Sequence, residues 1–403
     1  MSLPAQLMLP QSNLDYWGYM DRPDLFVSIG DSTDPAERML HVLRWFLCKD
    51  TKFKGEHAIL KKAFTPVLGE FFRCKMIVPD ARQPLFLPSE ERAGRASTES
   101  HASFSSHAAT LCPDADEACG EDLTIHCVSE QIIHSPSIAA FYYVSKARGG
   151  IIARGVDHVQ AKFTGTAVKI GPGDHNHGVY VHIAKHNEEY NCTHPWASVS
   201  GWLSGHPYIT VTDSTYITCP ESKLKLILSY KEEPFFGSPK FQMEGKIFRY
   251  DPVADRSKPI RDLKKVPDAD VVATVWGQWN GKIYARLHGR EGLLLDILAS
   301  ESTVKIVPHL EKQAANESRK LWHLVAEAIH AKEYAQATKL KRDIEDEARK
   351  VRQVKGGVHE SKFFDFKVPV LSTEKDVVAD TCWETGKPYL KAGVSLEFDK
   401  VTE

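Results

Sequence analysis

The chain has few of the features that mark secreted, membrane-spanning or nucleic-acid-binding proteins. No uncharged apolar run reaches the length of about 18 residues that a membrane-spanning helix requires. The start "MSLPAQLMLP" lacks a basic segment followed by a long apolar core, so we expect no secretory signal. The eight cysteines are scattered and form no C-x-x-C pair. We therefore expect a cytoplasmic protein whose thiols are reduced.

A strong net charge is also absent, because 51 basic side chains are balanced by 53 acidic ones and the formal net charge is −2. A dedicated nucleic-acid binder would carry a strongly basic surface, so we expect no nucleic-acid partner. The sequence contains no G-x-S-x-G, H-E-x-x-H or P-loop motif. It therefore offers no familiar catalytic motif.

What is present is a long middle section with the pattern of β-strands, between helical ends. From about residue 66 to residue 300, segments such as "YITVTDSTYITC" alternate or are rich in β-branched and aromatic residues. This pattern favours a sandwich or a barrel over a parallel α/β sheet. Helices are expected at residues 34–50, with Asp34 as the N-cap, and at 316–352. Residues 88–120 are predicted to be a flexible insertion.

Histidines offer two candidate sites for chemistry. His134 precedes Ser135, but neighbouring residues of a strand point to opposite faces, so we do not expect a Ser–His catalytic pair. A second group lies in one short segment and comprises His175, His177, His182 and His186. Histidines at i and i+2 share a strand face and can bind zinc, although no carboxylate follows at the usual spacing. A polar hairpin with solvated histidines is the competing interpretation.

A charged helix in the last quarter of the chain offers a candidate anion site. From charge alone its basic residues indicate a solvated face. Lys341, Glu345 and Arg349 are nevertheless spaced i, i+4, i+8, so Glu345 can pair with both cations and hold them extended. Two fixed cations are what an anion site requires.

Three motifs, in this order, resemble those of one known family. Residues 61–72, "KKAFTPVLGEFF", are similar to K-K-P-x-N-P-x-L-G-E, and residues 130–141, "EQIIHSPSIAAF", to E-Q-V-S-H-H-P-P-x-x-A-F. Lys341, Glu345 and Arg349 match a third pattern, K-x-x-x-E-x-x-x-R. These are the motifs of the oxysterol-binding-protein-related lipid transfer proteins, and weaker similarities extend over nearly the whole chain.

The resemblance implies a mainly β fold, a large and nearly closed antiparallel β-barrel around a central hydrophobic tunnel. It implies one lipid-binding domain over residues 1–403. Residues 1–50 would form a lid and N-terminal helices, residues 51–300 the barrel with its flexible insertion 88–120, and residues 301–403 a C-terminal helical subdomain. This agrees with the strand pattern described above.

The resemblance also implies lipid binding and non-vesicular transfer between membranes, without enzymatic activity. The tunnel would carry a sterol or phosphatidylserine, exchanged for phosphatidylinositol 4-phosphate. The expected partners are these membrane lipids and, transiently, a membrane surface; no metal or cofactor other than the bound lipid is expected, and the protein is expected to be a monomer. Two alternatives stay open, a lipid sensor or scaffold without transfer and a metalloenzyme that uses the histidine cluster.

Particular residues follow from the family motifs. His134 would lie at the tunnel mouth and contact a head-group phosphate, while Glu345 orients the cations. The residues implied for the phosphoinositide head group are Lys61, His134, Ser135, Lys341, Glu345 and Arg349. The residues implied for the lid are Tyr16, Trp17 and Tyr19.

The sequence departs from the family pattern at four positions. Ser135 replaces the second histidine, Ser137 the second proline, Thr65 an asparagine and Ala63 a proline. Losing one charge-assisted hydrogen bond costs about 1.5–3 kcal/mol, roughly tenfold to a hundredfold in affinity. The departure at Ser135 therefore bears directly on phosphoinositide binding.

A final segment resembles a docking motif of some family members, in which two phenylalanines lie in an acidic tract. Here lysines flank the phenylalanines of "SKFFDFK". We therefore expect Phe363, Phe364 and Phe366 to be packing residues.

Overall fold

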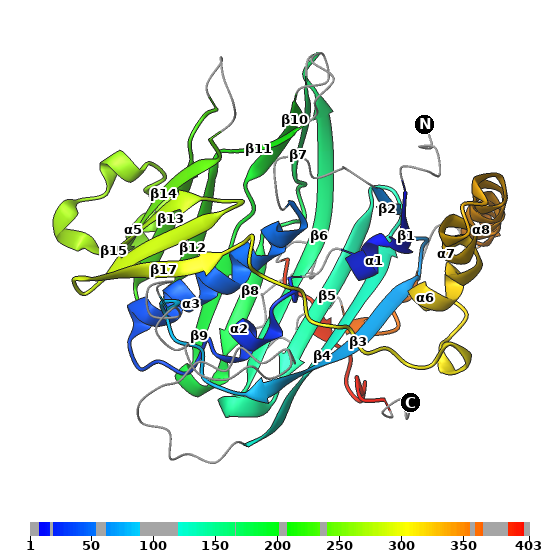
Figure 1. Ribbon diagram of the computed structural model, residues 1–403, viewed down its shortest axis with the longest axis horizontal. Helices are drawn as coiled ribbons and strands as arrows, with labels where there is room; N and C mark the ends of the chain where they lie inside the picture. The colour runs from blue at the N-terminus through cyan, green and yellow to red at the C-terminus, as the bar shows by residue number, and fades with distance from the viewer. Residues whose placement is uncertain are drawn as a thin grey trace, which may run out of the picture.

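The computed structural model describes residues 8–16, 19–53, 62–88, 120–165, 167–200, 208–233, 240–354, 359–365 and 386–398. One large antiparallel sheet dominates the structure, with most of the helices near the two ends of the chain (Figure 1). The prediction of a mainly β fold is confirmed. The predicted insertion 88–120 falls almost entirely outside the described residues.

The sheet has 15 strands, joined by antiparallel pairing. Its strands are β3 (Phe71–Asp80), β4 (Gly120–Ile133), β5 (Ile138–Ser145), β6 (Ile151–Phe163), β7 (Val168–Pro172), β8 (Val179–Ile183), β9 (Glu188–Cys192), β10 (Trp196–Ser200), β11 (Tyr208–Thr212), β12 (Ser214–Cys219), β13 (Leu224–Tyr230), β14 (Gln242–Arg249), β15 (Val271–Gln278), β16 (Lys282–Leu287) and β17 (Arg290–Asp296).

The remaining elements are short strands and helices outside this sheet. They are β1 (Met8–Ser12), α1 (Asn13–Tyr16), α2 (Pro23–Val27), α3 (Pro35–Leu47), β2 (Lys62–Phe64), α5 (Pro252–Ser257), α6 (Ser318–Leu321), α7 (His323–His330), α8 (Tyr334–Val354), β18 (Phe364–Asp365) and β19 (Tyr389–Leu390). Among the described residues, no helix combines the length and the apolar composition needed to cross a bilayer.

Strand β6 is the branch point of the sheet. Its first half pairs with β8, from Ile151↔Ile183 to Gly155↔Val179, and its second half pairs with β7, from Val159↔Pro172 to Phe163↔Val168. The main path then runs from β8 to β17, while β7, β10 and β11 form a side branch. The second half of β6 therefore extends beyond the main body of the sheet (Figure 1).

Other segments of the chain pair with β3 and β17, the strands at the two ends of the main sheet. On the β3 side, Lys75 and Ile306 exchange two backbone hydrogen bonds of 2.8 and 2.9 Å. On the β17 side, the Leu87 amide donates to the Leu293 carbonyl at 2.7 Å. These pairings satisfy backbone groups that an open edge would leave unpaired.

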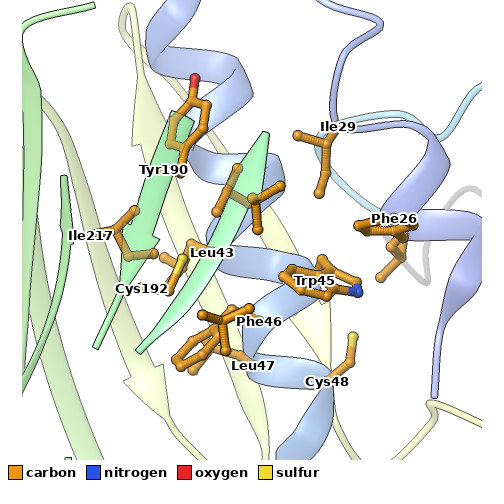
Figure 2. Packing of buried hydrophobic residues seen from close by; sticks show 14 of the residues in the cluster. Phe26, Ile29, Leu43, Trp45, Phe46, Leu47, Cys48, Tyr190, Cys192 and Ile217 are labelled. Atoms are coloured by element: carbon orange, nitrogen blue, oxygen red, sulfur yellow. The ribbon is translucent and has the colours of Figure 1, made fainter. Parts of the chain in front are cut away.

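Helix α3 forms the centre of the core. It begins as predicted, with the Asp34 carboxylate accepting a hydrogen bond from the Ala36 amide and Pro35 at the first helical position. Its apolar side chains on one side, including Leu43, face strand residues of β9 and β12, whereas Trp45 packs on Phe26 of α2 with ring centroids 5.2 Å apart (Figure 2). A helix buried on all sides must also satisfy its polar groups within the protein.

The polar face of α3 pairs with the sheet. Arg38 forms a buried ion pair with Glu188 of β9, with Nε and Oε2 2.8 Å apart. Tyr190 donates a second hydrogen bond to the same carboxylate at 2.7 Å. The helix is therefore fixed in the interior by polar contacts as well as by packing.

The cysteines that the structure describes are free and buried, which agrees with the predicted reduced thiols. Burial raises the pKa of the Cys219 thiol to about 11 and that of Cys48 to about 12. Both thiols therefore remain protonated and unreactive at neutral pH.

The C-terminal helices differ from the single helix expected at residues 316–352. The chain turns between α7 and α8, where Lys332 has a positive φ of 61°. The resulting helical hairpin packs on β1 and β2, which pair in parallel, through Phe64, Trp322 and Val325. The described residues beyond Val354 form the short strands β18 and β19 with bends and a turn, and no helix.

Candidate functional site

The candidate site lies where the β4–β5 turn meets α8 and the segment after β2. His134 is in this turn, and the backbone of Pro66 forms a hydrogen bond with its imidazole. Burial and then the positive charge of Arg352 lower the pKa of His134. The Nδ1 atom of His134 is buried and has no hydrogen-bond partner among the described residues. A neutral imidazole with one unsatisfied nitrogen therefore lies beside cations.

Helix α8 supplies these cations. Its inner face packs through Leu340, Ile344 and Ala348 against the cluster around Trp322. Lys341 lies on this side, with 14% of its side chain exposed, and pairs with Glu345 as predicted. The helix thus holds a largely buried ammonium group beside a carboxylate.

The predicted second pairing of Glu345 is wrong. Arg349 is 58% exposed and pairs with Asp346, with Nη1 and Oδ1 2.6 Å apart. The charge of Arg352 acts on His134 more strongly than that of Arg349. A helix has 3.6 residues per turn, so Arg349 lies about 80° from Lys341 around the axis but Arg352 only about 20°. Arg352 is the cation that the sequence analysis missed.

Ser137, one of the four positions that differ from the family motif, takes part in the β4–β5 turn. The Gln131 side-chain amide donates to the Ile133 carbonyl at 2.7 Å and to Ser137 Oγ at 3.0 Å. The Ser137 hydroxyl therefore helps to hold the turn that carries His134. Ser135 is exposed beside it. Lys61 lies outside the described residues, and its neighbour Lys62 is exposed at the start of β2.

Glu70, in the first motif, is a buried anchor rather than a contact at the surface. It accepts hydrogen bonds from the Val67 amide at 3.0 Å, Ser318 Oγ at 2.8 Å and Trp322 Nε1 at 3.1 Å, and also from Ser12. Burial raises its pKa. One carboxylate thus joins β1, β3 and α6.

Glu130, in the second motif, anchors the segment 359–363 in the same way. It is fully buried and accepts hydrogen bonds from His359 Nε2 at 2.9 Å, Ser361 Oγ at 2.5 Å, and the amides of Lys362 and Phe363 at 2.8 and 3.2 Å. Burial alone would raise the pKa of Glu130. The hydrogen bonds from these donors, that from His359 first, lower it by more than burial raises it, so the net change of the pKa is downward. Sequence analysis missed both carboxylates.

Gly69 connects the two motifs. Its φ is +77°, and a Cβ atom there would lie 2.8 Å from Cε1 of His359. The position therefore requires glycine for two reasons, the backbone conformation and the close approach of the imidazole. Phe363 and Phe364 are buried nearby, which is the packing role expected for them. Phe366 lies outside the described residues.

The three residues expected for the lid differ in their surroundings. Trp17 lies outside the described residues. The Lys52 ammonium lies over the ring of Tyr16, 5.5 Å from the ring centroid. Tyr19 points into the interior, where its hydroxyl donates to Asp157 Oδ1 at 2.9 Å and lies 3.1 Å from His194 Nε2. Phe46 and Phe141 flank its ring. The N-terminal segment is therefore tied to the inside of the sheet.

The partners of Tyr19 form a polar cluster in an apolar interior. Burial raises the pKa of Asp157 to about 6, although the hydrogen bond from Tyr19 opposes this change. Burial, assisted by the charge of Lys49, lowers the pKa of His194 to about 3. At neutral pH the cluster therefore holds a neutral imidazole and a carboxyl group whose charge is costly.

A small cavity lies near this cluster. Its volume is about 10 Å³, and Met20, Phe72 and Tyr143 are among its lining residues. This volume corresponds to about one water molecule. The lipid-sized tunnel implied by the resemblance stays a prediction.

The four histidines considered for zinc do not form a metal site. His175 stacks on His158 with ring centroids 5.5 Å apart, and His186 Nε2 lies 2.8 Å from the Gly30 carbonyl. Within the described ranges, no three His, Cys, Asp or Glu side chains gather as metal ligands.

Comparisons with known proteins agree with the motifs. The model of the oxysterol-binding protein family matches residues 1–327. Oxysterol-binding protein-like protein 1 of Schizosaccharomyces pombe is 37% identical, over 98% of this chain and 87% of that protein. Oxysterol-binding protein-related protein 11 of Mus musculus is 27% identical over 85% of this chain, and the match spans 42% of that protein. The chain thus spans less than half of this longer relative.

Solved structures share the fold. The Osh1 ORD domain in complex with cholesterol has a TM-score of 0.64 and 16% identity, over 97% of this chain and 82% of that chain. The Osh3 ORD in complex with PI(4)P from Saccharomyces cerevisiae has a TM-score of 0.61 and 15% identity, over 96% and 88%.

Proposed function

Because the chain belongs to the oxysterol-binding protein family, we propose that it binds single lipid molecules inside its curved sheet and transfers them between membranes. The cargo is a sterol, exchanged for phosphatidylinositol 4-phosphate. Structural neighbours crystallised with cholesterol, ergosterol and PI(4)P support this choice of lipids. The protein acts as a cytoplasmic monomer that contacts membranes transiently, and no covalent step is involved.

The observation that carries the phosphoinositide half of this proposal is the unsatisfied Nδ1 of His134. A buried polar atom without a partner is costly, and a ligand atom can supply the missing hydrogen bond. Lys341 and Arg352 add positive charge beside it. The negative charge of a phosphate favours the protonated imidazole, in which Nδ1 also carries a hydrogen and can donate. Charge-assisted hydrogen bonds to phosphate are stronger than neutral ones, so a phosphorylated head group fits this set of donors.

The sterol half rests on the apolar interior. Each buried CH₂ group contributes about 0.8 kcal/mol, so a lipid of roughly twenty carbons needs about 10–20 kcal/mol of compensation on leaving a membrane. The inner faces of the strands, with the polar cluster of Tyr19, Asp157 and His194, offer both apolar surface and partners for one hydroxyl group. Bound sterol would occupy this side of the interior.

Replacing Lys341 by alanine is expected to lower the uptake of phosphatidylinositol 4-phosphate by roughly tenfold to a hundredfold, because one charged hydrogen bond is lost. Uptake is measured by native mass spectrometry after incubation with mixed liposomes. The matched control is Lys339→Ala, since Lys339 is exposed on the same helix. Sterol uptake should be unchanged in both variants, and equal phosphoinositide uptake by wild type and Lys341→Ala would contradict the proposed site.

Arg349 and Arg352 of α8 should differ in their contribution to phosphoinositide binding. Arg352→Ala is expected to weaken phosphoinositide binding about tenfold, and Arg349→Ala clearly less, because the exposed Arg349 is engaged with Asp346. The comparison uses titration with a short-chain, water-soluble phosphatidylinositol 4-phosphate. The reverse order would show that Arg349 turns inward when the head group binds.

Transfer is separated from lipid sensing by a two-liposome assay. Donor liposomes carry fluorescent sterol, and acceptor liposomes carry phosphatidylinositol 4-phosphate. A carrier moves sterol to the acceptors and phosphoinositide in the opposite direction, with many turnovers per protein. A sensor would bind one equivalent of lipid and then stop.

A further inference from the structure

The β6–β7 hairpin exposes large apolar side chains. Phe163 is 76% exposed, Val159 58% and Ile170 37%. All three belong to the outer half of β6 or to its partner β7. Single exposed apolar residues are ordinary, but a group on one hairpin indicates an interaction surface.

Val159 and Phe163 lie on the face of β6 that lines the interior of the protein. Residues of a strand alternate between its two faces, so Ile151, Ala153, Asp157, Val159 and Phe163 share one face. Ile151 and Ala153 belong to the central core, and Asp157 contacts the interior Tyr19. The inner face of the sheet therefore continues along β6 until it becomes exposed at the tip.

The same apolar face extends across the side branch. The register places Val159 opposite Pro172 and Ala161 opposite Ile170, and Ile170 opposite Ala197 of β10. Further along, Val199 of β10 is 7% exposed, and its partner Ile209 of β11 packs against the core. The surface therefore runs from buried Val199 of β10 and partly buried Ile209 of β11 to exposed residues at β6 and β7.

The opposite face and the tip are basic. Lys162 and Lys169 are cross-strand partners, both exposed, and the Lys162 ammonium lies 5.1 Å from the Trp196 ring. The segment 158–173 contains no acidic residue. Neither lysine forms an ion pair with any residue that the structure describes.

The hairpin lies at the same end of the sheet as the candidate head-group site. Ile138, just after the His134 turn, pairs with His158, and β6 continues beyond this level to Phe163. A surface that contacted the tip would therefore also face the end of the sheet where the β4–β5 turn carries His134.

We propose that the β6–β7 hairpin is a membrane-docking element, which inserts Phe163 and Val159 into an anionic bilayer while Lys162 and Lys169 contact lipid phosphates. This inference rests on the proposed lipid transfer. Apolar side chains next to lysines match the boundary between acyl chains and anionic head groups. The exposed inner face of β6 then offers a lipid a continuous apolar path from the bilayer to the interior.

The first test measures binding of the whole protein to vesicles of phosphatidylcholine with and without phosphatidylserine, by co-sedimentation. Phe163→Ser is expected to weaken binding roughly tenfold or more. Val253→Ser is the matched control, because Val253 on α5 is also 76% exposed. Lys162→Gln with Lys169→Gln should abolish the preference for phosphatidylserine, whereas Lys258→Gln with Lys264→Gln should not.

A second measurement separates this inference from the proposed function. Sterol delivered from cyclodextrin reaches the protein without a membrane, so Phe163→Ser should bind it like wild type while extracting sterol from vesicles more slowly. If wild type binds no sterol from cyclodextrin, the sterol half of the proposed function fails, but vesicle binding still tests the hairpin. Unchanged vesicle binding by Phe163→Ser overturns the inference, and so does a wild-type dimer that this substitution converts into monomers.

Discussion

Replacing Glu130 by alanine is expected to lower the free energy of unfolding by about 3–5 kcal/mol, because four donors of the segment 359–363 lose a buried, charged acceptor. The measurement is urea denaturation of the full chain at neutral pH. Amide hydrogen exchange at Lys362 and Phe363 should accelerate at the same time, since both amides donate to this carboxylate.

The control for this prediction is Glu360→Ala. Glu360 belongs to the same segment, but its side chain is 93% exposed and its contact with Lys391 is long, at 3.6 Å. This variant should retain wild-type stability to within about 0.5 kcal/mol. Unchanged exchange at Lys362 and Phe363 in Glu130→Ala would mean that the segment is held by other contacts.

Replacing Asp157 by asparagine is expected to stabilise the protein above pH 6, by up to about 3 kcal/mol. Burial raises the pKa of Asp157 from 3.8 to about 6, so the folded protein binds its proton more tightly than the unfolded chain. Wild-type stability therefore falls as the pH rises from about 4 through 6, and each pKa unit corresponds to about 1.4 kcal/mol. Asparagine carries no such charge, and its amide oxygen can still accept the hydrogen bond from Tyr19.

The informative quantity is the difference in unfolding free energy between Asp157→Asn and wild type, measured from pH 4 to pH 8. Other groups titrate equally in both proteins, so this difference isolates Asp157. It should be small near pH 4 and reach its maximum above pH 6. Asp122→Asn, at an exposed position of β4, should show no such trend. A difference that does not change with pH would contradict the interior position of the Asp157 carboxyl group.

Much of the fold could be predicted because its signals are local. Alternation of apolar and polar residues identified the strands, and Asp34 followed by Pro35 marked the start of α3. The expectation of one helix over residues 316–352 was wrong because no proline or glycine marks the turn at Lys332. That turn is favoured by packing of α7 and α8 on Phe64 and Trp322, which are contacts between distant parts of the chain.

The candidate site could be predicted only in part. Motif spacing identified His134 and Lys341, and Lys341 pairs with Glu345 as expected. Motif spacing pointed to Arg349 and not to Arg352. A helix has 3.6 residues per turn, so residues at every fourth position move progressively around the axis and do not stay on one face. The low exposure of Lys341 and the unsatisfied Nδ1 of His134 depend on which face of α8 packs against the rest of the protein.

The sequence by itself therefore determined the β class, the helical ends and the family motifs, since these depend on neighbouring residues and short repeats. Only the tertiary structure decided that Glu70 and Glu130 are buried anchors, that Asp157 pairs with the interior Tyr19, and that the inner face of β6 becomes exposed at Phe163. Each of these properties arises from partners far apart in the chain, such as Glu130 and His359. Burial and long-range pairing are properties of the folded chain. They decide whether a given glutamate or aspartate is a buried structural residue or an exposed surface residue.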